Sequence, residues 1–268
     1  MKSKLLEIEL FLSSENVDIL CITEHWLKTC ELMFNFCNHQ IGSSFCRGNA
    51  IHGGSLILLS KKIKFKERKD IVSLSVERII EVSCVELEQF IIVSLYSPPS
   101  AQYDSLEKIL EQALYKLQKS KKKLIVSGDF NVNLLDNCSS SKRLLNLFKS
   151  YNLINTFIVP TRVTATTATC IDNIYSNIVP LNACIINKLT SDHSGQLFEF
   201  EILKCKDQKK KICTIPITED RLDRFRKNLI FKMPFLRSNQ CPNNLYSTFF
   251  DSFIGEFKNV FTPKTFLV

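Results

Sequence analysis

The stretch LIVSGDFNVNLL, residues 124–135, decides the fold, because an apolar run breaks off there into Gly-Asp-Phe-Asn. The run is short and partly β-branched, which predicts a buried strand, and the polar residues after it predict a turn at the strand's end. Asp129 and Asn131 alone are typical of an ordinary turn, because both side chains can bond to their own backbone. Their meaning depends on what the other strands carry at their ends.

Three further clusters of acidic or histidine side chains lie at or beside apolar strands. They are DILCITEH (18–25) with Glu24, CIDNIY (170–175) with Asp172, and TSDHSG (190–195) with Asp192 and His193. Carboxylates in such positions are costly unless they are paired or hold a cation. If the four strand ends meet at one edge, they gather hard oxygen ligands suited to Mg²⁺ or Mn²⁺. The set then has the parts for metal-assisted attack of water on a phosphodiester.

The rest of the chain alternates helical and strand patterns, with hairpins as well as helical crossovers. This mixture favours an α/β sandwich with mixed sheets over a simple doubly wound sheet. Residues 30–50 show no clear period and are interpreted as a long surface excursion, and Asp104 with Glu107 predicts a capping box. Helices are expected near 3–13, 104–120 and 141–151, and strands near 17–23, 55–60, 78–98 (two), 124–131, 153–157, 171–175, 183–188 and 197–203.

Composition adds weaker constraints. The 268 residues carry a net charge of +8, which suits a polyanionic partner but equally a solvated surface. The 11 cysteines form no C-x-x-C pair, so reduced thiols and an intracellular site, nucleus or cytoplasm, are expected. The spacing of Cys37, His39, Cys46 and His52 fits no standard zinc finger. No apolar run approaches a membrane span, so no membrane partner is expected.

Six blocks, in order, carry a family resemblance. They are DILCITEHWL (18–27), GGSLILLS (53–60), VSLYSPPS (93–100), LIVSGDFNVNLL (124–135), PTRVTATTATCIDNIYSN (160–177) and TSDHSGQLFEF (190–200). Over about residues 1–203 the chain resembles the endonuclease/exonuclease/phosphatase superfamily, and within it the apurinic-type endonuclease domain of non-LTR retrotransposons. The resemblance implies a four-layer α/β sandwich, with two mixed β-sheets packed face to face and helices outside. It also implies a Mg²⁺-dependent endonuclease that nicks DNA.

The resemblance also implies a role for each matched residue. Glu24 would be the principal metal ligand, with Asp129 and Asp192 beside it. Asp129 would also orient or deprotonate the attacking water, and Asn131 would hold that water and a phosphate oxygen. Tyr96 would lie near the scissile phosphate, and Arg162 would face the DNA backbone. Asp172 would fix the tautomer of His193, which would act on the phosphate as a donor or as the base.

Two departures from the family are expected. The family's domain begins with a strand that carries an Asn, and here Met1 falls at the first helix, so that strand is expected to be missing. Residues 204–268 start with the charged linker KCKDQKKK (204–211) and then resemble the helical region that precedes a reverse transcriptase. The whole is interpreted as a truncated retrotransposon copy, whose full-length ancestor would have a reverse transcriptase domain and element RNA as partners.

Three alternatives stay open. The chain could be a phosphoesterase of the same superfamily that acts on small phosphate esters, or an inactive remnant that at most binds nucleic acid. The lysines at 61, 62, 64 and 66 could contact DNA or could form a solvated face. Trp26 is interpreted as a packing residue under the metal site, not as a base-stacking wedge, and His25 as a loop residue.

Overall fold

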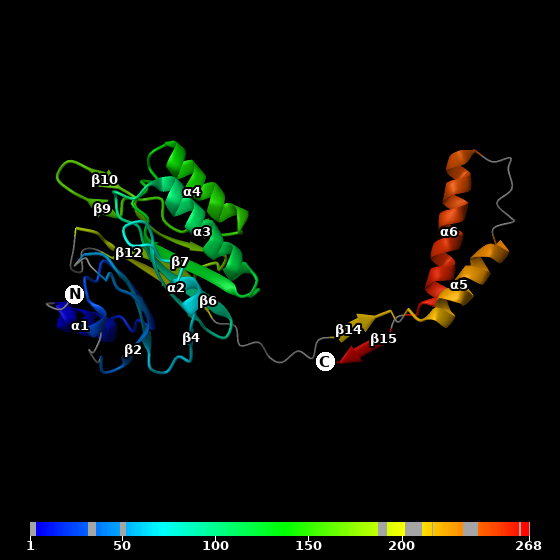
Figure 1. The fold of residues 1–268 in the computed structure, drawn as a ribbon, viewed down its shortest axis with the longest axis horizontal. Coiled ribbons are helices and arrows are strands. Elements are labelled where there is room, and N and C mark those ends of the chain that lie inside the picture. The colour runs from blue at the N-terminus through cyan, green and yellow to red at the C-terminus, as the bar shows by residue number, and fades with distance from the viewer. Residues whose placement is uncertain are drawn as a thin grey trace. The chain divides into compact units, whose positions relative to one another are not determined.

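The computed structural model divides the chain into two compact units, Met1–Ile202 and Leu203–Val268. The structure describes residues 4–31, 36–48, 52–186, 192–201, 211–215, 217–232, 241–262 and 264–267. Figure 1 shows the order of the elements along the chain. Because the positions of the two units relative to each other are not determined, each unit is described by itself.

The first unit is built around a six-stranded mixed sheet of order β4-β5-β6-β7-β11-β8. Its strands are β4 (Lys66–Glu67), β5 (Glu81–Glu86), β6 (Phe90–Tyr96), β7 (Lys123–Asp129), β8 (Ile154–Asn155) and β11 (Asp172–Ser176). β6 and β7 are parallel, joined by a helical crossover, and the other neighbours are antiparallel. The pairing sets Tyr96 beside Asp129, and Asp129 beside Asp172.

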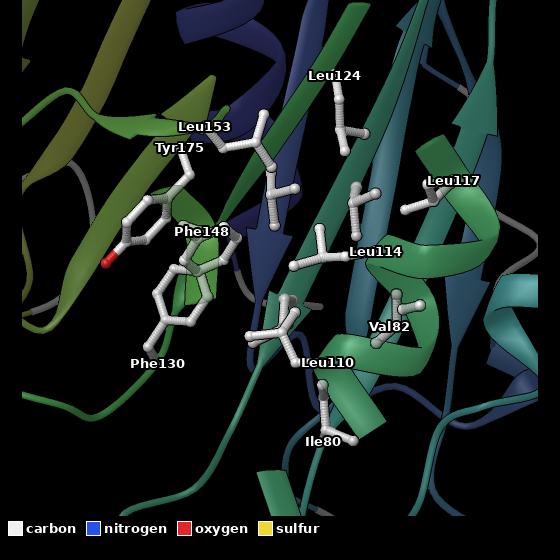
Figure 2. Packing of buried hydrophobic residues seen from close by; sticks show 14 of the residues in the cluster. Ile80, Val82, Leu110, Leu114, Leu117, Leu124, Phe130, Phe148, Leu153 and Tyr175 are labelled. Carbon is white, nitrogen blue, oxygen red and sulfur yellow. The ribbon is translucent and has the colours of Figure 1, made fainter. Parts of the chain in front are cut away.

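Two amphipathic helices, α3 (Tyr103–Gln118) and α4 (Ser139–Ser150), cover one face of this sheet. Figure 2 shows Leu110, Leu114 and Leu117 of α3 lying over the strands, with Phe130, Phe148 and Tyr175 packed beside them. The rings of Phe148 and Tyr175 are stacked at 3.6 Å between centroids. Apolar residues at helical spacing on α3 and α4 meet every second residue of β6 here, so this face is the main core.

A second sheet layer covers the opposite face. It contains the three-stranded sheet β1-β3-β2 and the hairpin β12–β13. Its strands are β1 (Ile19–Thr23), β2 (His39–Phe45), β3 (Ser55–Ser60), β12 (Asn182–Ile186) and β13 (Gly195–Glu199). In β3, Ile57 and Leu59 face the six-stranded sheet, and Leu56 and Leu58 face the helix α1 (Leu5–Ser14). The layers are therefore helix, sheet, sheet, helix, which confirms the predicted four-layer α/β sandwich.

Two edges of the second sheet layer, those of β1 and β13, line one groove. Among the described residues β1 pairs only with β3, and β13 pairs only with β12. A groove of about 1080 Å³ is lined by every residue of both strands, with Phe90, Ile92 and Ile125 of the central sheet also in its wall. The expectation that one strand is missing from this layer stays a prediction, and the two open edges are where such a strand would pair.

The remaining short elements complete the first unit, and the second unit holds helices and a hairpin. The short elements are η2 (Thr29–Glu31), α2 (Lys69–Val72), β9 (Arg162–Val163) and β10 (Ala168–Thr169). The second unit has β14 (Lys211–Thr214), α5 (Glu219–Lys232), α6 (Pro242–Val260) and β15 (Lys264–Leu267). Phe225 of α5 packs edge-on against Phe253 of α6. Of the predicted linker 204–211, all but Lys211 lies outside the described residues.

Two local predictions were wrong. The expected surface excursion at 30–50 contains β2, a full strand of the second sheet, with a bulge between Ile41 and Ser43. The expected capping box is absent, because α3 begins at Tyr103 and Asp104 and Glu107 pair with Arg143 instead. No helix in the described part of the chain has the length and apolar character that crossing a membrane requires.

Candidate active site

The groove between β1 and β13 collects all eight side chains that the sequence singled out. It is lined by Glu24, Tyr96, Asp129, Asn131, Arg162, Asp172, Asp192 and His193. They come from six separate strand ends and turns, spread over 170 residues of sequence. The sheet register brings them together, because β7 sits between β6 and β11 and all three present their polar ends at the same edge.

Asp129 and Asn131 form a rigid turn at the end of β7. The Asn131 backbone N–H donates to Asp129 Oδ1 at 3.0 Å, and the Asn131 side-chain amide donates to the Ser97 carbonyl at 2.8 Å. Asn131 has a φ of 50°, which Asn tolerates better than most residues. Both bonds fix the carboxylate and the amide relative to β6, so the turn keeps two oxygen-bearing groups at defined positions in the groove.

Gly128 is required next to this turn because β6 passes very close to it. A Cβ added at Gly128 would lie 2.0 Å from the Leu95 carbonyl oxygen, which is backbone and cannot move aside. The glycine in the Gly-Asp-Phe-Asn motif therefore allows β6 and β7 to approach, and this approach places Tyr96 beside Asp129.

Asp172, His193 and Thr161 form a hydrogen-bonded chain on the other side of Asp129. His193 Nδ1 donates to Asp172 Oδ2 at 2.9 Å, and the Thr161 hydroxyl donates to the same oxygen at 2.8 Å. Thr161 Oγ1 also accepts the Asp172 backbone N–H at 3.1 Å. The carboxylate thus holds one ring nitrogen of His193 and is itself held by a fully buried threonine.

The electrostatics of the three groups are coupled. Burial, and after it the negative charge of the neighbouring Asp172 carboxylate, raise the pKa of Asp129 to about 8. For His193, burial alone would lower the pKa, but the hydrogen bond and the negative charge of Asp172 outweigh burial and raise it. The site therefore has a buried carboxyl that needs a positive neighbour and a histidine that favours its charged form.

Glu24 reaches the groove from the other sheet layer and meets Tyr96 there. The Tyr96 hydroxyl donates to Glu24 Oε1 at 2.5 Å. Burial, and then this bond and the charge of Glu24, raise the pKa of the Tyr96 phenol, so Tyr96 stays a neutral donor. Glu24 has a φ of 53°, and its backbone N–H donates to the Gly54 carbonyl. The left-handed backbone turns this carboxylate into the groove.

The neighbours of Glu24 differ from the sequence prediction. His25 lies in a loop, as predicted, but it is buried: Nδ1 accepts the Leu27 N–H at 3.0 Å, and Nε2 donates to the Phe45 carbonyl at 2.9 Å. Trp26 was interpreted as a packing residue, but its side chain is 48% exposed. The positive φ of Glu24 and Trp26 reverses the two orientations, so the histidine packs inside and the indole lies at the surface.

Arg162 and Asp192 pair at the groove's rim. Arg162 reaches Asp192 Oδ2 with both Nε and Nη2 at 2.7 Å, and this bond lowers the pKa of Asp192. Both side chains are exposed. Among the described residues, Asp129, Asp172 and His193 place possible metal-ligand atoms within 4.8 Å of one another. Asp192 and Glu24 line the same groove but are not members of that group.

The donor set fits a small hard cation. Two carboxylates meet there, and one of them is only 4% exposed, so a nearby positive charge would offset the cost of ionising it. The predicted lysines lie elsewhere: none of the four lines the groove, and the Lys61 ammonium donates to the carbonyls of Phe36 and Cys37 at 3.0 Å.

Some residues that shape the site were missed by the sequence prediction. Thr161 stands beside Arg162 in the block Pro-Thr-Arg, yet a lone threonine gives no signal of its role. Glu81 is fully buried and accepts bonds from Arg47 Nε and from the Gly54 N–H, both at 2.5 Å. It supports the Gly53–Gly54 turn to which Glu24 is bonded. Only the fold shows that Glu81, 57 residues from Glu24, belongs to the site.

Comparison with known proteins agrees with this geometry. A sequence model of the Endonuclease/Exonuclease/phosphatase family matches residues 2–193. Among solved structures, the endonuclease domain of TRAS1, a telomere-specific non-LTR retrotransposon, is similar, with a TM-score of 0.57 and 16% identity over 74% of this chain and 93% of that chain.

Two other solved structures show the same fold. An AP endonuclease from Archaeoglobus fulgidus has a TM-score of 0.56 and 13% identity, covering 75% of this chain and 95% of that chain. A 3′ phosphatase from Neisseria, bound to a product DNA hairpin, has a TM-score of 0.55 with the same identity and coverage. No curated protein matches the chain. At these identities the likeness shows the fold alone.

Proposed function

This chain belongs to the Endonuclease/Exonuclease/phosphatase family, and from that premise we propose that it is a Mg²⁺-dependent endonuclease of retrotransposon origin that nicks DNA. One observation carries the proposal. Eight side chains chosen from the sequence line one groove, and three of them bring ligand atoms within 4.8 Å of one another. Such a set is what hydrolysis of a phosphodiester requires.

In the proposal Glu24 and Asp129 hold the cation, Mg²⁺ or Mn²⁺, as the family resemblance implies. Of the three residues whose ligand atoms lie within 4.8 Å of one another, only Asp129 is then a metal ligand. Asp192 is a further predicted ligand, although its carboxylate is bonded to Arg162 in this structure. The ion, when bound, stabilises negative charge on the phosphate. The pKa of Asp129, about 8 without a cation, then matters for the chemistry. A positive neighbour would favour the ionised form that orients water or takes its proton.

The remaining roles follow from the hydrogen bonds. Asn131, anchored through its amide nitrogen to Ser97, presents its amide oxygen to the water or its nitrogen side to a phosphate oxygen. Tyr96 stays protonated, donates to Glu24 and lies near the scissile phosphate. Asp172 keeps His193 charged and oriented, and His193 stabilises the charge that develops on the phosphate. The water oxygen forms the new P–O bond as its proton passes to Asp129. The bond between phosphorus and the strand's 3′ oxygen breaks, and that oxygen takes a proton from solvent.

DNA as the substrate is supported by the neighbours' own descriptions, a retrotransposon endonuclease, an AP endonuclease and a 3′ phosphatase bound to a DNA hairpin. The net charge of +8 is compatible with a polyanion. Small phosphate esters stay the second candidate, because the same groove chemistry would serve both.

The test is nicking of supercoiled plasmid by the full chain with Mg²⁺, against the variants Asp129→Ala and His193→Ala. We expect relaxed plasmid from the wild type and a loss of roughly 10²–10⁴-fold in each variant, the range for removal of an acid–base group. Phosphate release from a nucleoside monophosphate, measured in parallel, would favour the second candidate. Equal nicking by wild type and Asp129→Ala would show that the site does not cut DNA, and the chain would then be an inactive remnant.

A further inference from the structure

The indole of Trp26 stands in an unusual place. It is the chain's single tryptophan, it is 48% exposed, and it lines the same groove as Glu24, Tyr96 and Asp129. A large aromatic side chain exposed beside a polar site is expensive to keep there, because burying it would remove apolar surface from water. Other large apolar side chains of the chain are exposed as well, so what distinguishes Trp26 is its place in the groove beside the polar site.

The backbone holds Trp26 outward against its own preference. Its φ of 58° is a left-handed conformation that bulky residues avoid. Two bonds to the Gly53–Gly54 turn maintain it: the N–H of Glu24 donates to the Gly54 carbonyl at 2.8 Å, and that of Trp26 donates to the Gly53 carbonyl at 3.0 Å. A strained backbone conformation that surrounding hydrogen bonds enforce is found most often at functional positions.

The residues around the Gly53–Gly54 turn are held in place by close contacts. His25, between the two outward residues, uses both ring nitrogens inside the protein. A Cβ at Gly54 would lie 2.3 Å from the His25 ring, and one at Gly53 would lie 2.4 Å from the Arg47 guanidinium. Glu24 and Trp26 therefore leave the same clamped turn, and what fixes the carboxylate in the groove also fixes the indole.

The ring of Trp26 is also oriented. His52 meets it edge-on, with 4.6 Å between ring centroids and planes at 90°. An edge-to-face partner sets the plane of an indole without covering both its faces. The result is an aromatic surface of fixed direction at the rim of a groove that also holds Arg162, a group suited to a phosphate.

We propose that Trp26, oriented by His52, is a stacking site for a nucleobase of the bound nucleic acid strand. This inference rests on the proposed function, since it takes the groove as the place where nucleic acid binds. Every base offers a π-face, so such a contact tolerates any sequence but requires a base to be present. The contact would favour DNA in which a base beside the cleaved bond can unstack from the next base. It would therefore influence where the strand is cut.

The single tryptophan makes the test direct. The full chain is titrated, without divalent cation so that nothing is cut, with a twelve-residue oligothymidylate and with an abasic oligomer of equal length and charge. We expect the oligothymidylate to quench the indole fluorescence and the abasic oligomer to leave it unchanged. Trp26→Leu should weaken oligothymidylate binding, followed by anisotropy, roughly tenfold, while Trp26→Phe keeps most of it. Binding of the abasic oligomer should be equal in all three proteins.

A matched control is Tyr115→Leu, since Tyr115 is also exposed but lies on α3 and does not line the groove. Equal thermal midpoints for the Leu and Phe variants exclude a folding defect. The stacking site is overturned if fluorescence does not respond to oligothymidylate, or if Trp26→Leu binds as the wild type does, even when plasmid is nicked. Base-dependent quenching in a protein that does not nick would instead keep the stacking site and reject the nuclease activity.

Discussion

At the residue scale, Asp129 links the stability of the protein to pH. Burial, with the Asp172 carboxylate beside it, raises its pKa to about 8, whereas an aspartate in an unfolded chain has a pKa near ~4. Between these values the folded chain keeps a proton that the unfolded chain has lost. The stability that this group contributes is therefore complete below about pH 4 and is lost as the pH rises through about 8.

The variant Asp129→Asn tests this reasoning, because an amide does not titrate. In chelator, we expect the variant to gain stability relative to the wild type between pH 5 and pH 8, by on the order of 3 kcal/mol. Urea unfolding at the two pH values measures the difference. A gap between variant and wild type that stays constant with pH would contradict the raised pKa. Adding Mg²⁺ at pH 8 should stabilise the wild type only.

Thr161 offers a second residue-scale test, as a positioning residue. Thr161→Val keeps the shape but removes the hydroxyl that donates to Asp172 and accepts its N–H. We expect a loss of about 1–3 kcal/mol in unfolding free energy and a lower kcat for nicking with little change in KM. Thr161→Ser, which restores the hydroxyl, should recover kcat. If Val and Ser variants nick equally well, the hydroxyl does not position Asp172.

The sequence predicted some of these residues and not others, for a physical reason. Asp129 and Asp172 lie at or beside the ends of apolar strands, and a carboxylate at the end of an apolar run can be recognised in the sequence. The orientations of the His25 and Trp26 side chains could not be predicted from the sequence. They depend on the positive φ of Glu24 and Trp26, which is set by hydrogen bonds to Gly53 and Gly54, some 30 residues later in the sequence.

At the scale of elements, the open edges of β1 and β13 predict an incomplete second sheet. Each has one partner among the described residues, and the groove between them exposes apolar side chains. Because an unpaired edge leaves N–H and C=O groups without ladder bonds, one extended segment could pair with both. A six-residue Val-Thr strand, joined ahead of α1 through a Gly-Ser linker, should raise the thermal midpoint by several degrees.

The control is the same extension with Pro at two central positions. Proline has no N–H to donate, so it interrupts a ladder while the length and linker stay the same. We expect no rise in the midpoint from this extension, measured by calorimetry. Equal midpoints for the two extensions would show that the edges do not accept a strand.

The helices and strands that the sequence predicted correctly are those with a distinct apolar pattern. β3, with LILL in the interior of the strand, and β7, with LIV, were predicted because burial on both faces makes a continuous apolar run. β2, HQIGSSF, was missed because only Ile41 and Phe45 are large and apolar. Its place in the sheet comes from pairing with β3, along six residue pairs, and not from its own composition.

At the scale of the whole molecule, charge is divided unevenly between the two compact units. Residues 203–268 hold 13 Lys and Arg against 6 Asp and Glu, so they carry +7 of the chain's net +8. Residues 1–202, which contain the groove and the family match to residue 193, are nearly neutral. The sequence indicated a change of texture at Lys204. The boundaries predicted there, 1–203 and 204–268, stay a prediction about folding.

The uneven charge predicts that residues 1–202 carry out the chemistry and that residues 203–268 contribute most of the electrostatic attraction to DNA. A chain of residues 1–202 should nick plasmid at a similar kcat, because every residue of the site remains. Its binding to duplex DNA should be weaker and should depend less on salt, because each phosphate contact contributes a slope of about −0.9 to log K against log salt. Anisotropy titrations between 50 and 200 mM salt, with and without residues 203–268, measure that slope. If the two slopes are equal, the basic segment does not contact DNA, and the nearly neutral first unit must supply the phosphate contacts through local groups such as Arg162.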